Sequence, residues 1–380
     1  MKSYSETRFS VAPMMDWTDR HYRFMARQLS QKAVLYTEMI HARAIVHGDR
    51  SRFLDFHPEE QPLVLQLGGN EPEYLAQAAR WAERWGYSEI NLNCGCPSDK
   101  VASGSFGACL MADPSHVARL VESMKEAVSI PVTVKSRIGI ESKGMSPLSD
   151  YDHLQHFTRT IVEAGCDRLI VHARIAVLGG LNPAENRTVP PLRYDDVYRL
   201  KEEFPDLPIE LNGGLRTLDE MRKHLQGSLD GIMVGRSAYE TPRILGSVDS
   251  LLDNGHAGLQ ATDFARETNS SSFQSGEFQG VSEAMTTSRV RESQRVLLSQ
   301  VLEKMHGYIL DRFDEGVPPA RIVRHMLGLF HGIPGARRIR QSLSGKWYAG
   351  LENRILLGRY LAEVFAEVTE MDSANTAPQT

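Results

Sequence analysis

The chain has 380 residues, a formal net charge of −5 and 41% hydrophobic residues, which is enough for one large domain and a smaller one. No apolar run is long enough to span a bilayer and residues 1–8 are polar, so we expect neither a membrane segment nor a signal peptide. The 4 cysteines do not form the framework of a short secreted protein, which predicts free thiols and a cytoplasmic location.

Short apolar segments recur along the chain, and amphipathic stretches follow several of them. We predict strands over residues 9–15, 33–40, 63–69, 89–94, 131–138, 168–173, 208–212 and 231–235. Helical patterns lie at residues 16–29, 71–85, 114–127 and 148–164. Buried strands alternating with helices in this way predict an α/β fold, a (β/α)8 TIM barrel. A doubly wound open sheet is the alternative, but the turn after the first strand lacks the G-x-G-x-x-G pattern that such a sheet normally carries.

The composition changes after the eighth predicted strand. Residues 1–253 form the predicted barrel domain, and residues 254–287 are rich in Ser, Thr, Gly and Gln, as is typical of a flexible linker or an insertion. A helical period of apolar residues returns over residues 288–370, which we assign to a small all-helical domain. Residues 371–380 are expected to be a disordered tail.

Polar residues and a thiol follow the fourth predicted strand, where the sequence reads Asn-Cys-Gly-Cys-Pro from Asn93 to Pro97. In parallel α/β folds, ligands bind at the carboxyl ends of the strands. Gly95 and Pro97 restrict the backbone on both sides of Cys96 and therefore give its thiol a defined direction. A cysteine is more often a small buried hydrophobe than a catalytic group, so both interpretations of Cys96 stand at this point. No metal site is expected, because Cys94 and Cys96 lack the two further ligands of a structural zinc site.

The other predicted strands also deliver polar or soft side chains to this end of the barrel. These residues are Met14, Met15, Gln66, Lys135, Arg137, His172, Arg174, Asn212, Gly213, Gly214, Gly235 and Arg236. Each alone is more often structural than functional, but polar groups at so many strand ends are costly to bury unless a ligand meets them. The glycines after the seventh and eighth strands allow backbone N–H groups to approach an anion, and Arg236 adds a charge. A phosphorylated cofactor is therefore indicated, and the Met, Gln, Lys and His side chains suit flavin mononucleotide (FMN).

The predicted helical domain carries a cluster of basic residues. Between Gly316 and Leu351 there is no Asp or Glu, whereas Arg and Lys recur at Arg321, Arg324, Arg337, Arg338, Arg340 and Lys346. Such clusters are often only a solvated face, and the acidic net charge argues against nucleic acid, but a local basic surface suits phosphates. Arg337 and Arg340 are three residues apart and would point the same way on a helix.

Taken together, these stretches resemble the tRNA-dihydrouridine synthases, in particular subfamily A. The matching stretches are residues 12–19, 65–69, 91–98, 134–137, 171–174, 212–214, 234–236, 324–330 and 332–337. They follow one another in order and cover nearly the whole chain apart from the Ser-rich segment and the tail. The resemblance implies an FMN enzyme that uses NADPH to reduce uridines in the D-loop of tRNA, at positions 20 and 20a.

The resemblance also assigns roles to residues. It implies that Cys96 is the acid that gives a proton to uracil C5, while hydride from the flavin reaches C6. The implied FMN contacts are Pro13, Met14, Met15, Gln66, Lys135, His172, Asn212, Gly213, Gly214, Gly235 and Arg236. The implied tRNA contacts are Asn93, Arg187, Arg337 and Arg340. We expect a cytoplasmic monomer that binds tRNA but neither metal nor membrane.

Two other classes of protein remain open on the sequence alone. One is an FMN barrel oxidoreductase that acts on a free pyrimidine or another enone, which would have no need of a basic helical domain. The other is a tRNA-binding protein without catalysis, for which replacing Cys96 would leave dihydrouridine formation unchanged.

Overall fold

The computed structural model describes residues 9–98, 104–142, 144, 146–254, 280–344, 347–351 and 353–374, with only the backbone for 254, 280–291 and 374. The chain divides into two compact units. The first comprises residues 1–23 and 32–236, and the second comprises residues 24–31 and 237–380. The predicted domain boundary at residue 253 therefore lies inside the second unit, and the assignment of functions to the segments stays a prediction.

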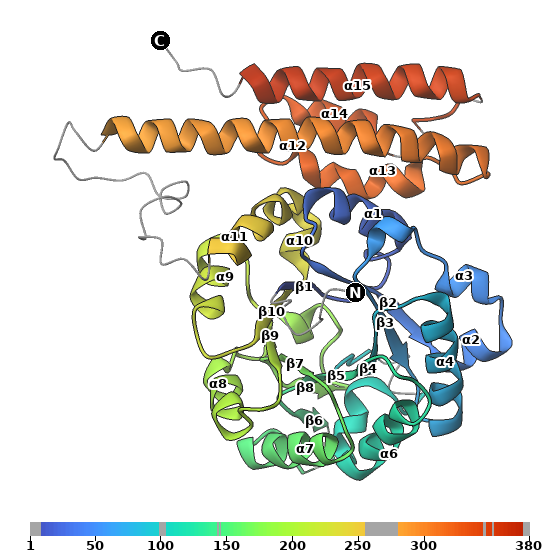
Figure 1. Ribbon diagram of the computed structural model, residues 1–380, viewed down its shortest axis with the longest axis vertical. Coiled ribbons are helices and arrows are strands. Elements are labelled where there is room, and N and C mark those ends of the chain that lie inside the picture. The colour runs from blue at the N-terminus through green and yellow to red at the C-terminus, as the bar shows by residue number, and fades with distance from the viewer. Residues whose placement is uncertain are drawn as a thin grey trace. The chain divides into compact units, whose positions relative to one another are not determined.

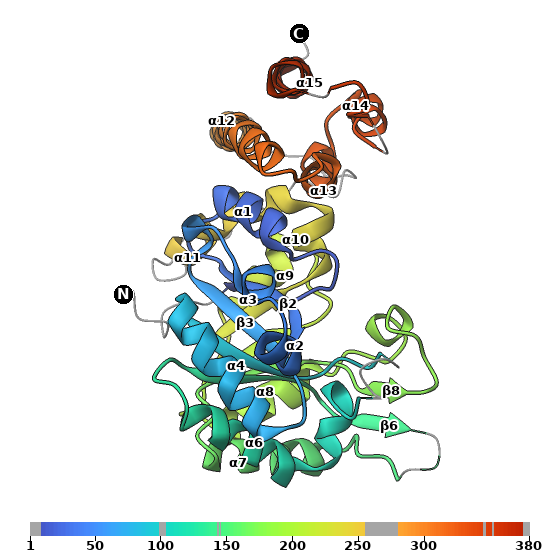
Figure 2. The same ribbon diagram turned by 90° about the vertical axis from the view of Figure 1, so that its right-hand side faces the viewer.

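The first unit is built on a closed barrel of eight parallel strands, in the order β1-β10-β9-β7-β5-β4-β3-β2. The strands are β1 (Phe9–Val11), β2 (Val34–His41), β3 (Leu63–Gly68), β4 (Glu89–Cys94), β5 (Val132–Arg137), β7 (Leu169–His172), β9 (Ile209–Asn212) and β10 (Gly231–Val234). Each predicted strand has a counterpart in this barrel, so the predicted (β/α)8 fold is confirmed. The sequence did not predict β6 (Ile140–Ser142) and β8 (Ala176–Leu178), which pair with each other in a separate sheet, visible apart from the barrel in Figure 2.

Helices surround the barrel strands, as Figure 1 shows for α2, α4 and α6 to α9. In chain order the helices are α1 (Arg20–Leu29), α2 (Ala42–His47), α3 (Arg50–Leu54), α4 (Pro72–Trp85), α6 (Pro114–Lys125), α7 (Tyr151–Glu163), α8 (Tyr194–Glu203) and α9 (Leu218–Leu225). Local signals explain their limits: α4 ends at Gly86, whose φ of 96° is the left-handed conformation that glycine tolerates. At the start of α9, Thr217 and Glu220 form a capping box.

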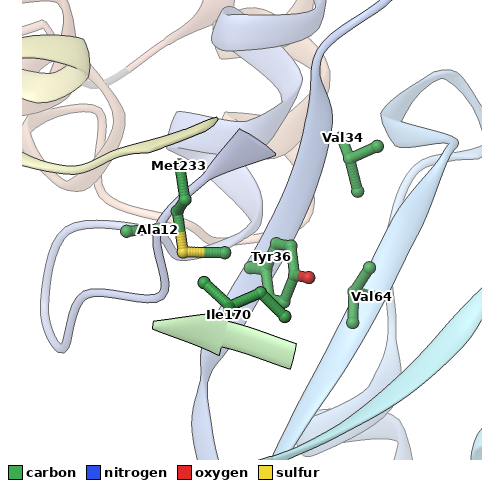
Figure 3. Close-up of a cluster of buried hydrophobic side chains, with 6 residues drawn as sticks. All are labelled: Ala12, Val34, Tyr36, Val64, Ile170 and Met233. Atoms are coloured by element: carbon green, nitrogen blue, oxygen red, sulfur yellow. The ribbon is translucent and has the colours of Figure 1, made fainter. Parts of the chain in front are cut away.

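Within the barrel interior, an apolar layer is followed by polar side chains toward the carboxyl ends of the strands. The apolar layer, drawn in Figure 3, consists of Ala12, Val34, Tyr36, Val64, Ile170 and Met233. Because side chains alternate between the two faces of a strand, the same alternation brings Gln66 inward on β3, Asn91 and Asn93 on β4, and Lys135 on β5. The candidate site is therefore the polar end of a packed barrel.

The second unit is helical. Its elements are residues 24–29 of α1, α10 (Arg236–Glu240, which begins at the last residue of the first unit), α11 (Val248–Asn254), α12 (Gly280–Asp314), α13 (Ala320–Met326), α14 (Ala336–Ser342) and α15 (Arg354–Ala374). Helix α15 runs alongside α12 (Figure 1), where His306 bonds to the Gly358 carbonyl at 2.9 Å and Arg354 pairs with Asp311 at 2.9 Å.

Two predicted segments fall partly inside these helices. Helix α12 begins at Gly280, within the predicted linker 254–287, and α15 reaches Ala374, within the predicted tail 371–380. Residues 255–279 and 375–380 of those segments lie outside the described residues. Among the helices that the structure describes, none is long and apolar enough to cross a membrane.

Candidate active site at the carboxyl ends of the barrel strands

Cys96 lies in the loop after β4, and hydrogen bonds hold the backbone of this loop. The Asn93 Oδ1 atom accepts from the backbone N–H groups of Gly95 and Cys96, at 3.0 Å each. The Cys96 carbonyl accepts from the Ala108 N–H at 3.0 Å. The half-buried Cys96 thiol lies 3.6 Å from the Ser98 hydroxyl. The loop therefore holds this thiol partly exposed where the strand ends.

The other cysteines have surroundings that suit packing. Cys94 is fully buried, and burial raises the pKa of its thiol. Cys166 is also buried and donates to the Arg168 carbonyl at 3.1 Å. Cys109 donates to the Phe106 carbonyl at 3.0 Å, and burial raises the pKa of its thiol as well. Of the four, Cys96 is best placed to meet a ligand.

Lys135 projects from β5 into the same region. Its Nζ donates to Asn212 Oδ1 at 3.1 Å, and the Asn212 amide in turn donates to the Met233 carbonyl at 2.8 Å. Burial, reinforced by the neighbouring Arg137 charge, lowers the pKa of Lys135 to about 7. Its amine is therefore close to its titration midpoint at neutral pH and would gain a proton if an anion bound beside it.

Arg137, two residues along β5, joins three segments of the chain through their backbone carbonyls. It donates to Gly95 at 3.2 Å, to Ile175 at 3.2 Å and to Asn186 at 2.8 Å. Burial lowers the pKa of Arg137 to about 10, so it still carries its charge at neutral pH. Arg137 thus braces the Cys96 loop against the segment after β7.

His172 and the glycines after β9 are packed closely together. Gly213 and Gly214 have φ values of 113° and 78°, which side chains rarely adopt. A Cβ atom on Gly213 would come within 2.6 Å of the His172 ring, and one on Gly214 within 2.6 Å of the Tyr194 hydroxyl. Burial and the surrounding cations, Arg137 first, hold the pKa of His172 well below its usual value. The imidazole is therefore neutral at pH 7.

The mouth of the barrel has a marked excess of positive charge. Arg236 donates to the Arg187 carbonyl at 3.5 Å, and its charge adds to burial in lowering the pKa values of Arg187 and Arg174. Within the described parts of the chain, no ion pair is formed by Lys135, Arg137, Arg174, Arg187 or Arg236. Uncompensated cations of this kind are typical of a site for an anionic ligand.

Sequence analysis missed one member of this cationic cluster. Burial is the largest cause that lowers the pKa of Arg174, and the charges of Arg236 and then Arg216 lower it further. Its position in the sequence could have indicated this, because Arg216 follows the predicted phosphate-binding turn Asn212–Gly214 by only two residues. An exposed arginine after a turn is common on protein surfaces, so the sequence pattern alone did not single it out.

The remaining predicted cofactor contacts lie around the same mouth. Met14 is held in a turn by the Thr18 hydroxyl, which accepts from its N–H at 2.9 Å, and Met15 is 56% exposed. A Cβ atom on Gly235 would meet the Met14 sulfur at 3.6 Å, which is ordinary contact. Gln66 is 1% exposed, and its amide donates to Asn91 at 2.8 Å and accepts from Asn93 at 2.9 Å. Both Gln66 and Asn93 are therefore part of a buried network as well as predicted ligand contacts.

The predicted tRNA contacts are divided between the units. Arg187 is exposed in the first unit, and Arg337 is exposed on α14 of the second, without a side-chain partner among the described residues. Arg340 is partly buried and donates to the Phe330 carbonyl at 3.3 Å. Arg338 pairs with Glu367 of α15, so part of the basic cluster is neutralised by a helix outside it.

No group of three or more His, Cys, Asp or Glu side chains that could hold a metal ion occurs within the described ranges. The polar groups that the structure places at the mouth of the barrel include a half-buried thiol, a lysine, a neutral histidine and arginines without carboxylate partners among the described residues.

Comparison with known proteins agrees with this geometry. The family model described as Dihydrouridine synthase (Dus) matches residues 10–347. A relative from Synechocystis sp. is 48% identical over 335 residues, covering 88% of each chain, and bears the name tRNA-dihydrouridine(20/20a) synthase. Relatives with the same name from Shewanella oneidensis (46% identical over 336 residues, 88% of each chain) and Pseudomonas aeruginosa (48% over 337 residues, 89% of each chain) are equally extensive. The chain belongs to the dihydrouridine synthase family.

Proposed function

We propose that this protein reduces uridines of the tRNA D-loop to 5,6-dihydrouridine at positions 20 and 20a, with FMN as bound flavin and NADPH as reductant. The observation that carries the proposal is the half-buried Cys96 thiol beside a glycine-lined mouth whose arginines lack carboxylate partners among the described residues. The names of the relatives support the substrate and the positions. The proposal includes a cytoplasmic monomer.

The residues of the mouth fit a flavin phosphate in both shape and charge. Gly213 and Gly214 carry no side chain that would keep a ligand from their backbone N–H groups, and Arg236 would place a positive charge near the phosphate. Lys135 would take up a proton beside a bound anion, while His172 offers a neutral ring with a donor and an acceptor nitrogen. FMN bound there would supply the hydride that uracil receives at C6.

Cys96 completes the reaction by giving its thiol proton to uracil C5. Addition of hydride at C6 leaves negative charge on the C5–C4–O4 unit, and the new C5–H bond forms as the S–H bond breaks. The thiolate then regains a proton from water. Because the target base must leave its stack to reach the site, which costs a few kcal/mol, contacts to the rest of the tRNA are needed to offset that cost.

FMN affinity is expected to fall as the pH rises from about 7 to about 9, by up to about tenfold per pH unit. In the free protein, burial beside Arg137 lowers the pKa of Lys135 to about 7, so the amine is mostly neutral above that pH. An anion favours the charged amine, and binding above pH 7 therefore takes up a proton. Kd measured by flavin fluorescence over this range checks the prediction. Lys135→Met should bind FMN more weakly and without this pH dependence, whereas a flat profile for the unaltered protein would contradict it.

Replacing Arg337 with alanine is expected to weaken tRNA binding and to reduce the slope of log K against log salt by about 1, as for loss of one phosphate contact. Arg338→Ala is the matched control, because it removes an exposed arginine of the same helix whose charge is already paired with Glu367. Filter binding or fluorescence anisotropy over a range of salt concentrations measures both slopes. Equal effects of the two substitutions would remove Arg337 from the proposed interface.

The direct test of the proposal offers the purified protein FMN and NADPH with either unmodified tRNA or free uracil and uridine. We expect dihydrouridine in tRNA and turnover of the free compounds at least about 10²-fold slower, because binding energy from the tRNA body offsets the cost of extracting the base. Comparable turnover of free pyrimidine would favour an oxidoreductase of small molecules instead.

A further inference from the structure

A continuous chain of buried side chains links the interior of the barrel to the backbone of Cys96. The Thr133 hydroxyl donates to the Glu89 carboxylate at 2.6 Å, and the Asn91 amide donates to the Thr133 oxygen at 3.0 Å. The chain then continues through Gln66, which donates to Asn91 at 2.8 Å, and Asn93, which donates to Gln66 at 2.9 Å. We call these five residues the interior relay.

The interior relay ends at the candidate acid. Asn93 Oδ1 accepts from the N–H groups of Gly95 and Cys96, both at 3.0 Å. All five relay residues are at most 8% exposed, and Glu89, Asn91 and Thr133 are fully buried. Apolar side chains could fill the barrel core at a lower free-energy cost, because each buried polar group is costly unless it finds a hydrogen-bond partner.

The hydrogen bonds of the relay all run in one direction. Asn93 must present its oxygen to two backbone N–H groups, so its NH2 group faces Gln66 and obliges Gln66 to present its own oxygen. The same constraint passes from Gln66 to Asn91 and on to Thr133, whose hydroxyl donates to the Glu89 carboxylate at the far end. Turning any one amide over would place two donors or two acceptors face to face.

The strand register makes the relay rigid. Gln66 lies opposite Asn91, and Asn91 lies opposite Thr133, across the neighbouring strands β3, β4 and β5. The three side chains therefore stand at one level of the barrel, and the backbone ladder fixes their spacing. The spacing fixed in this way extends to Asn93, whose oxygen holds the turn that carries Cys96.

We propose that Glu89, Thr133 and Asn91 are positioning residues, which act through Gln66 and Asn93 to hold the Cys96 turn in the geometry needed for proton donation. The inference rests on the proposed role of Cys96 as the acid. Proton transfer requires the thiol to be held at about 3–3.5 Å from the accepting carbon, and a displacement of about 1 Å costs about 10²-fold in rate. Loss of the Thr133 hydroxyl leaves the Asn91 NH2 group without its acceptor, so that Asn91, and through it Gln66 and Asn93, is held less firmly in place.

Two substitutions at the far end of the relay and one control beside it test this inference without touching the mouth. Thr133→Val keeps the shape of the side chain and removes the hydroxyl, which breaks the relay. Thr133→Ser keeps the hydroxyl and should restore most of the activity. Tyr36→Phe is the matched control, because the Tyr36 hydroxyl donates to the same Glu89 oxygen at 3.3 Å but lies outside the relay.

The expected result is a change in kcat with binding preserved. For Thr133→Val, kcat for dihydrouridine formation should fall by about 10- to 100-fold, while the FMN Kd and the KM for tRNA change by no more than about twofold. Thr133→Ser and Tyr36→Phe should stay within about threefold of the unaltered protein. The rate of iodoacetamide labelling at Cys96, followed by peptide mass spectrometry, should change in Thr133→Val and not in Tyr36→Phe.

The outcomes separate this inference from the proposed function. If Thr133→Val retains the kcat of Tyr36→Phe, or loses FMN and tRNA binding together with kcat, the relay is only structural and the inference is overturned. Cys96→Ala, measured in the same series, tests the role of Cys96 on its own. If Cys96→Ala remained active, the acid would be another group, and the inference would be overturned together with that part of the proposed function.

Discussion

Replacing Cys96 with alanine is expected to lower the rate of dihydrouridine formation by about 10²-fold or more, the usual contribution of a general acid. The reason is that the C5 proton would then have to come from water in a site built to hold a thiol. FMN binding and reduction of the flavin by NADPH should persist, since neither requires the thiol. Single-turnover kinetics with reduced enzyme and tRNA isolate the affected step.

Cys109→Ala is the control for this prediction. Cys109 is also half-buried and lies on the segment that follows the Cys96 loop, but its thiol is bonded to the Phe106 carbonyl at 3.0 Å. Its replacement should change the single-turnover rate by no more than about threefold. If the two alanine variants reacted equally fast, Cys96 would not be the acid.

Replacing Arg168 with methionine is expected to lower the free energy of unfolding by about 3–5 kcal/mol. Arg168 and Glu210 form a buried ion pair with a 2.6 Å separation, and the Ser10 hydroxyl donates to the second Glu210 oxygen at 2.7 Å. Both charged side chains are at most 5% exposed. Removing the arginine leaves the Glu210 carboxylate in the barrel interior without this cation. The free-energy cost of a buried carboxylate without its cation is much larger than the net contribution of the intact pair to stability.

Two further variants make the stability prediction specific. Combining Arg168→Met with Glu210→Leu removes both charges and should recover most of the lost stability, as is often found for buried pairs. Arg222→Met disrupts the exposed Arg222–Asp219 pair and should cost less than about 1 kcal/mol. Urea unfolding followed by circular dichroism measures all three. If Arg168→Met lowered the free energy of unfolding as little as Arg222→Met does, the buried Arg168–Glu210 pair would not have the importance for stability that we assign to it.

Local sequence patterns were sufficient to predict the barrel. The strands alternate or run in short apolar segments, and their spacing leaves room for one helix or a short helical connection between successive strands. The pattern did not predict β6 and β8, because each has only three residues and pairs with a strand from which α7 and β7 separate it in the chain.

Part of the sequence signal for the predicted site comes from positions where the backbone imposes a requirement on residue type. Gly213 and Gly214 adopt positive φ values and have close neighbours, so the two consecutive glycines in the sequence already indicated a tight turn at this point. The interior relay was not predictable from the sequence, although Asn91 and Asn93 are polar residues within a buried strand. The hydrogen-bond partners of these side chains depend on the register between neighbouring strands. That register cannot be derived from the sequence of one strand alone.

The charge pattern of the second unit shows the same limit. Sequence analysis placed Arg337, Arg338 and Arg340 together as a basic surface because no acidic residue occurs nearby in the chain. In the folded unit, Arg338 pairs with Glu367 and Arg340 bonds to the Phe330 carbonyl, whereas Arg337 stays exposed. Partners that come from a distant helix are invisible to a count of charges along the sequence.

The most direct test of the proposed function is to map dihydrouridine in a tRNA transcript after reaction with the purified protein, FMN and NADPH. Nuclease digestion and mass spectrometry give the position of each 2 Da increase in mass, which is the mass of the two hydrogens added to a uridine. We expect dihydrouridine at positions 20 and 20a, and none at those positions with Cys96→Ala over the same reaction time. Absence of dihydrouridine from the tRNA, with flavin bound and reduced by NADPH, would contradict the proposal.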